Sequence, residues 1–167
     1  MSDAVAELVA AAGWKLRTML CTRCFYTDAD LIMLYKSHLL SFLEYRTPAV
    51  YHATRAILAR LDSVQNILLK DIGVDEVTAL AEFHLAPLAI RRDIAMLGVI
   101  HRTALGKGPP HFAKYFYRLG PGLLHDPRKD SSASIIKRSA LGLVAVYNLL
   151  APEIVAAKSV KQFQREL

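Results

Sequence analysis

The sequence predicts an all-α protein, a compact bundle of about six or seven helices. Apolar residues recur at helical spacing along most of the chain, while the strict alternation typical of strands is nearly absent. A hydrophobic fraction of 53% with 22% charged residues is typical of a globular protein. The 167 residues suffice for one domain, residues 1–167, with a buried core.

Two helices are predicted in the first third of the chain, over residues 3–23 and 28–46. Thr27 is a suitable N-cap for the second helix. That helix is apolar on most sides, which is typical of a central helix surrounded by others. Pro48 ends or kinks it, because proline lacks an N–H group and disfavours helical geometry at the preceding residue.

The middle of the chain predicts three more helices. Thr54 begins the first of them and Gly73 ends it. Its apolar residues form one stripe: Ile57, Leu61, Val64, Leu68 and Ile72. A short helix follows over residues 75–85. A longer one begins at Pro87, where proline suits a first helical position, and closes at Gly106.

The last third predicts shorter elements. The aromatic stretch "HFAKYFYRL", residues 111–119, is expected to form a short helix, and one long surface loop is expected near residues 117–134. A helical stretch follows over residues 139–155. Ser159, with Gln162 three residues later, predicts a capping box for a final short helix.

The charge favours a polyanionic partner. Lys and Arg total 21 against 15 Asp and Glu, a net charge of +6. Such a surface favours nucleic acid, or less often an anionic membrane face. Charged residues interrupt every apolar run, so no membrane-spanning helix is expected. The acidic start, with Asp3 and Glu7, is a poor signal peptide, which predicts an intracellular protein, cytoplasmic or nuclear.

Metal, cofactor and catalytic motifs are weak. Cys21 and Cys24 have no second ligand pair, so we expect reduced thiols and neither a zinc site nor a redox pair. Asp28 and Asp30 are interpreted as first-turn acids favoured by the helix dipole. No nucleophile motif or glycine-rich phosphate loop occurs, and no cofactor is expected. His38 and His101 lie on apolar helix faces and are expected to be buried and hydrogen-bonded.

One helix face carries the strongest binding signal. Arg91, Ala95, Gly98 and Arg102 lie at helical spacing on one side, and Arg92 and Lys107 add charge nearby. Two arginines that bracket two small residues would suit a phosphate backbone at close approach. The alternative is tight packing against another helix, with arginines extending to solvent. Both interpretations stay open from the sequence.

Several segments resemble non-LTR (LINE-type) retrotransposon reverse transcriptases in their C-terminal region. The matching pattern is Leu-x-x-Leu-Tyr-Lys-Ser, then Leu-Glu-Tyr, a small residue and Pro, then an amphipathic helix with Leu-x-x-Val-Gln. The segments are "LIMLYKSHLLSFLEYRTPAVYHATRAILARLDSVQNILLKDIGV", "LAPLAIRRDIAMLGVIHRTALGKGP" and "YNLLAPEIVAAKSVKQFQREL". In the last, Tyr147 replaces the usual Trp, and the expected Pro is delayed to Pro152.

The resemblance implies a thumb and post-thumb region, a helical element that packs on the palm and grips template and primer by the backbone. The paired aspartates of a palm are missing, so no catalysis is expected from the chain itself. Lys36 and Arg46 become possible backbone contacts beside Arg91, Arg92, Arg102 and Lys107. The expected partners are RNA or DNA and a reverse-transcriptase palm. The alternative function is a helical protein–protein interaction module.

Overall fold

The computed structural model describes residues 2–120 and 122–167. It divides the chain into two compact units, Met1–Arg92 and Asp93–Leu167, each with its own hydrophobic cluster. The predicted all-α class is confirmed, since helices dominate both units and the strands in the described part of the chain form a single small hairpin. The boundary between the units falls within helix α7, so the chain is continuous and helical there. The prediction of one domain therefore stays a prediction.

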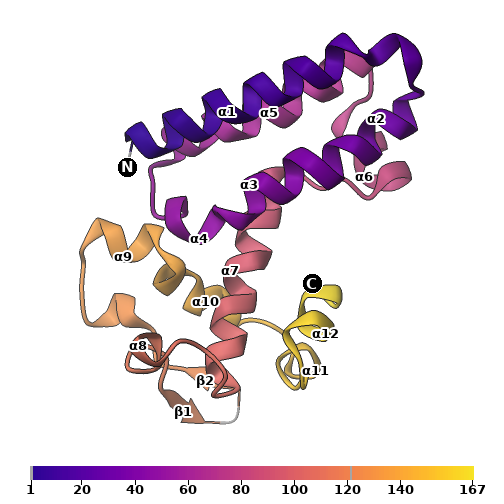
Figure 1. Ribbon diagram of the computed structural model, residues 1–167. Helices are drawn as coiled ribbons and strands as arrows, with labels where there is room; N and C mark the ends of the chain where they lie inside the picture. Colours follow the sequence, from indigo (N-terminus) through magenta and orange to yellow (C-terminus); the bar gives the residue numbers. More distant parts are fainter. Residues whose placement is uncertain (1, 121) are drawn as a thin grey trace. The chain divides into compact units, whose positions relative to one another are not determined.

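The first unit consists of helices. They are α1 (Ser2–Cys21), η1 (Arg23–Phe25), α2 (Asp28–Leu34), the π-helical η2 (Tyr35–Leu40), α3 (Ser41–Tyr45), α4 (Thr47–Val50), α5 (Arg55–Ile72), α6 (Glu76–Phe83) and the start of α7 (Leu88–Ala104). Helices α1 and α5 lie side by side, with α2, η2 and α3 in line beneath them (Figure 1).

Helix α5 matches its prediction. Leu61, Val64, Leu68 and Ile72 are buried along one stripe, and Ile57 is partly buried beside them. Gly73 ends the helix in the left-handed region at φ 74°, where glycine carries no Cβ penalty. Thr54 occupies the N-cap position without a capping hydrogen bond from its side chain.

The predicted helix over residues 28–46 is interrupted by η2. Thr27 caps α2 as expected, and Thr27 and Asp30 bond reciprocally in a capping box. The wider turn of η2 changes which side chains face inward. Leu39 and Leu40 are both buried, while His38 is exposed, so the prediction of a buried His38 was wrong.

The helical run is interrupted near Pro48 and then resumes, which is the second of the two expected effects. Helix α3 ends at Tyr45, but α4 begins at Thr47 with Pro48 inside its first turn. Proline is tolerated there because the first N–H groups of a helix lack intrahelical partners. Thr47 is therefore helical and buried, contrary to the expectation from the residue that follows it.

The second unit has shorter elements after α7. They are α8 (Pro110–Ala113), β1 (Arg118–Gly120), β2 (Leu123–Leu124), η3 (Pro127–Lys129), α9 (Ser134–Arg138), η4 (Ala140–Leu143), α10 (Val144–Tyr147), α11 (Pro152–Val155) and α12 (Val160–Arg165). The predicted aromatic helix over 111–119 was wrong beyond Ala113, because β1 and β2 pair as an antiparallel hairpin. The expected loop near 117–134 therefore holds this hairpin and η3.

His101 lies at the centre of the second unit, 1% exposed, as the sequence predicted. Its Nε2 is 2.9 Å from the carbonyl oxygen of Ala157, which can only accept, so Nε2 carries the proton. Its Nδ1 then accepts from the Tyr147 hydroxyl at 2.9 Å. The ring stacks on Phe163 with centroids 4.2 Å apart. This network links α7 to α10, to the segment after α11 and to α12.

Leu61→Ala and Leu68→Ala should each lower the free energy of unfolding by about 2–5 kcal/mol, because each leaves a cavity in the core. The wild-type side chains are 3% and 0% exposed. Chemical denaturation of the full chain measures the effect. Ile67→Ala is the control: Ile67 is 54% exposed, and its loss should cost less than about 1 kcal/mol. Three equal midpoints would show that this stripe is not core.

Acid should weaken the fold through His101. Burial lowers the pKa of its imidazole below the ordinary 6.5, and the nearby Arg118 lowers it further, against the Ala157 carbonyl. The unfolded chain takes up the proton more readily, so the contribution of neutral His101 is complete above about pH 6.5 and is lost as the pH falls below that.

Denaturation midpoints at about pH 7.5 and pH 5.5 should therefore differ more for wild type than for His101→Gln. An NMR titration of the His101 ring gives an independent reading of the same pKa. A His101 pKa at or above 6.5 would contradict the prediction.

Candidate nucleic-acid interface

The charge of the chain is unevenly divided between the two units. Residues 1–92 contain ten Lys and Arg and ten Asp and Glu, so their net charge is zero. Residues 93–167 contain eleven Lys and Arg against five Asp and Glu, a difference of +6. The whole positive excess therefore belongs to the second unit.

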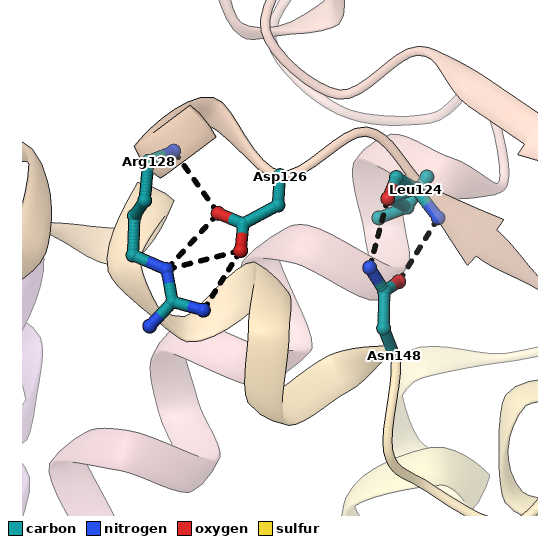
Figure 2. A network of polar contacts seen from close by, with 4 residues as sticks. All are labelled: Leu124, Asp126, Arg128 and Asn148. Carbon is teal, nitrogen blue, oxygen red and sulfur yellow. Dashed lines mark hydrogen bonds and ion pairs between the residues drawn. The ribbon is translucent and has the colours of Figure 1, made fainter. Parts of the chain in front are cut away.

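Every Lys and Arg of the second unit is exposed to solvent. They are Arg102, Lys107, Lys114, Arg118, Arg128, Lys129, Lys137, Arg138, Lys158, Lys161 and Arg165. Arg128 is paired with Asp126 at 2.7 Å, which holds the pKa of that carboxyl below its usual value (Figure 2). With few acids to oppose them, these cations give the unit a positive surface potential.

Two of the six predicted binding residues belong to this basic unit. Arg102 and Lys107 are both exposed near the end of α7. The Nε of Arg102 donates to the Lys107 carbonyl at 3.0 Å. That bond orients the guanidinium without neutralising it, since its acceptor is uncharged. Both residues remain candidates for contact with phosphate.

The other four predicted residues have partners within the first unit. Arg92 is 7% exposed and donates twice to Asp62, at 2.6 and 3.1 Å. Arg91 donates to Glu44 at 2.5 Å. Lys36 donates to a backbone carbonyl, that of Phe83. Arg46 is exposed and lies over the ring of Phe42, 5.2 Å from its centroid.

The ion pairs of Arg91 and Arg92 change how these residues are interpreted. A guanidinium paired with a carboxylate attracts phosphate less strongly, because the carboxylate offsets its charge and repels the phosphate. The division of the chain also assigns Arg91 to one unit and Arg102 to the other. The predicted role of Arg91 and Arg92 in nucleic-acid binding stays a prediction. Their ion pairs with Glu44 and Asp62, which the sequence did not reveal, oppose it.

Helix α12 packs closely against α7 at Gly98, where the absence of a side chain leaves room for it. A Cβ at Gly98 would lie 2.5 Å from the Gln164 Nε2 and 3.2 Å from the Val160 Cγ1. The Gln164 amide also donates to the Ile94 carbonyl at 3.4 Å. Gly98 is buried, so the packing interpretation of this glycine is the one that the structure supports.

Two exposed tyrosines accompany the cations, and sequence reasoning placed them on a helix that does not form. Tyr115 and Tyr117 are 43% and 49% exposed. The Lys114 Nζ lies 4.9 Å from the Tyr115 ring centroid, and Tyr117 stacks on His125 at 4.6 Å. Counting charges separately in the two halves of the chain would have found this basic, aromatic region from the sequence.

The described residues contain no group of three or more His, Cys, Asp or Glu side chains that could hold a metal ion. Cys21 and Cys24 are exposed and free of disulfides. No helix in the described part of the chain is both long enough and apolar enough to span a bilayer.

Comparisons with known proteins leave the family open. A scan against protein-family models found no match, and searches of curated proteins and of solved structures found none either.

Gly98→Leu should lower the free energy of unfolding by about 1–3 kcal/mol, because the larger side chain must displace α12. Gly13→Leu is the matched control, since a Cβ at Gly13 in helix α1 has no atom within 4 Å. Leucine at that position should be neutral or stabilise by up to about 1 kcal/mol through helix propensity. Thermal melts of both variants test this. A Gly98→Leu variant as stable as wild type would refute the packing of α12 on Gly98.

Proposed function

We propose that this chain binds the backbone of nucleic acid through the basic surface of residues 93–167 and performs no catalysis by itself. The observation that supports it best is the confinement of the entire +6 charge to a unit whose eleven Lys and Arg side chains are all exposed. Exposed cations release condensed counterions when they meet phosphates, which drives sequence-independent binding.

The exposed tyrosines suit unpaired bases. Base stacking on an aromatic ring contributes about 1–3 kcal/mol per base and tolerates any sequence. Tyr115 and Tyr117 lie between Lys114 and Arg118 in the chain, so two exposed rings are flanked by cations within five residues. Exposed rings next to cations favour a single-stranded segment or a junction over a uniform duplex.

The biological setting that we propose follows from the resemblance to non-LTR reverse transcriptases. In that setting the chain is a thumb and post-thumb fragment that grips template and primer and depends on a palm for chemistry. The exposed positive surface is compatible with this role. We expect no preference for a particular base sequence, because contacts to phosphates position a strand but do not distinguish its bases.

Removing Arg102 and Lys107 together, as Arg102→Gln with Lys107→Gln, should weaken binding to all nucleic acids alike. The slope of log affinity against log salt should fall by about 2, one unit for each lost phosphate contact. The measurement is fluorescence anisotropy with a mixed-sequence RNA–DNA junction at several salt concentrations.

The matched control removes two exposed cations of the first unit, Arg55→Gln with Arg60→Gln. The net charge changes equally, but affinity and slope should stay close to wild type. If the control weakens binding as much as the test pair, the interface is not confined to residues 93–167. Affinity of the wild type that is independent of salt would refute backbone binding altogether.

A protein-interaction module remains the second candidate, supported by one apolar groove in the first unit. The groove has a volume of about 680 Å³ and runs between α1 and α5, where Trp14 is 70% and Ile67 54% exposed. The two segments expected to dock a partner fit less well. The helix over 28–46 already packs its apolar face, including Leu31, Tyr35 and Leu39, into the core of its unit, and "HFAKYFYRL" is mostly non-helical.

Trp14 is the sole tryptophan, so its fluorescence separates the two candidates. A protein docked in the groove would shift its emission to shorter wavelength and shield it from iodide. Nucleic acid bound to the second unit should leave the emission unchanged.

A further inference from the structure

The second unit contains a cavity that is open to solvent on one side and has a volume of about 510 Å³, a size typical of small-molecule sites. Its walls are the end of α7, the β1–β2 hairpin and the segment from Tyr147 to Lys158. All three belong to residues 93–167, so the cavity is a property of this unit alone.

The polar side chains in the wall are already satisfied. His101 bonds to Tyr147 and to the Ala157 carbonyl. Asn148 bonds to the backbone of Leu124 on both sides of its amide. The rest of the lining is mainly aliphatic, as with Leu105. The uncharged polar side chains of the wall therefore need no polar ligand atom, and the aliphatic part of the lining favours an apolar body.

Asn148 also makes the cavity a preformed one. Its Nδ2 donates to the Leu124 carbonyl at 2.8 Å, and its Oδ1 accepts from the Leu124 N–H at 2.9 Å (Figure 2). This pair of bonds continues the hairpin's hydrogen bonding and ties β2 to the opposite wall. Leu124 is 2% exposed, so its side chain anchors β2 in the core.

Two cations line the cavity and also reach solvent, Arg118 and Lys158. No Asp or Glu occurs among the described residues that line it. One N–H of Arg118 donates to the Ala104 carbonyl at 2.6 Å, which fixes the guanidinium beside the wall and leaves its charge uncompensated. In keeping with this position, the positive charge of Arg118 lowers the pKa of His101 and opposes the burial that raises the pKa of Tyr147.

We propose that this cavity binds a small monoanion with an apolar body, of the class of medium-chain carboxylates, with its head group held by Arg118 and Lys158 and its chain against the aliphatic wall. The carboxylate of such a ligand would lie near the positive charges of Arg118 and Lys158, and its hydrocarbon chain would contact the aliphatic part of the lining. A nucleobase fits less well, because the side chains of His101, Tyr147 and Asn148 are already engaged in hydrogen bonds and much of the remaining lining is aliphatic. The inference is independent of nucleic-acid binding.

Isothermal titration calorimetry of the full chain with octanoate, below its micelle-forming range, tests the proposal, with neutral 1-octanol as the matched ligand. Octanoate should bind with one-to-one stoichiometry and more tightly than 1-octanol. Arg118→Gln and Lys158→Gln should each weaken octanoate binding by about 1.5- to 5-fold, as expected for exposed ion pairs, and leave 1-octanol unaffected. Lys137→Gln, equal in charge change but outside the cavity lining, should bind octanoate like wild type.

Substitutions that fill the cavity provide a second test of the proposed ligand site. Ala104→Leu should weaken both ligands by about tenfold or more, because the added side chain takes up the space that they need. Ala156→Leu, at an exposed position of the lining, serves the same purpose if Ala104→Leu fails to fold by circular dichroism.

The proposal is overturned if octanoate does not saturate, if 1-octanol binds as tightly, or if all variants bind octanoate equally. Each of these results leaves the salt dependence of nucleic-acid binding untouched, so the two proposals fail separately.

Discussion

A buried polar group must find a hydrogen-bond partner, and this constraint organises both units of the chain. In the first, Tyr35 donates to Gln65, whose amide donates in turn to the Ala86 carbonyl. In the second, His101 joins Tyr147 to the Ala157 carbonyl. Within the described residues no buried side-chain nitrogen or oxygen lacks a partner. A buried polar group that loses its hydrogen bond costs about 1–3 kcal/mol, so each network fixes which helices pack together.

The same constraint decides which cations are available for function. Arg92 is buried, so it needs the carboxylate of Asp62, and the pair holds α5 against the start of α7. A charge used in this way stabilises the fold and is costly to withdraw. Arg102, Arg118 and Lys158 lie at the surface instead, and their charges face solvent. The surplus of positive charge in residues 93–167 would attract both a phosphate backbone and a small carboxylate.

Local signals in the sequence were most reliable where a single residue fixes the backbone. Gly73 and Thr27 ended and began helices as predicted, because a left-handed glycine and a capping hydroxyl act within one turn. The π-helical turn of η2 has no comparable signal. It inserts one residue into the helical repeat, which turned His38 outward and buried Leu39 and Leu40 together. The hairpin of β1 and β2 was missed too, since two short strands with a register shift show no alternation.

The sequence by itself determined the helical class, the buried stripe of α5 and the buried, bonded state of His101, because helical periodicity places apolar residues on one face whatever lies opposite. The sequence also contains the excess of positive charge in its second half. Assigning that excess to one structural unit required the boundary near Arg92. Only the tertiary structure decided that Arg92 meets Asp62, that α12 fills the space at Gly98, and that Arg118 and Lys158 share a cavity. Each of these pairs is separated by tens of residues, and which side chains meet across such distances is set by packing, which no local spacing encodes.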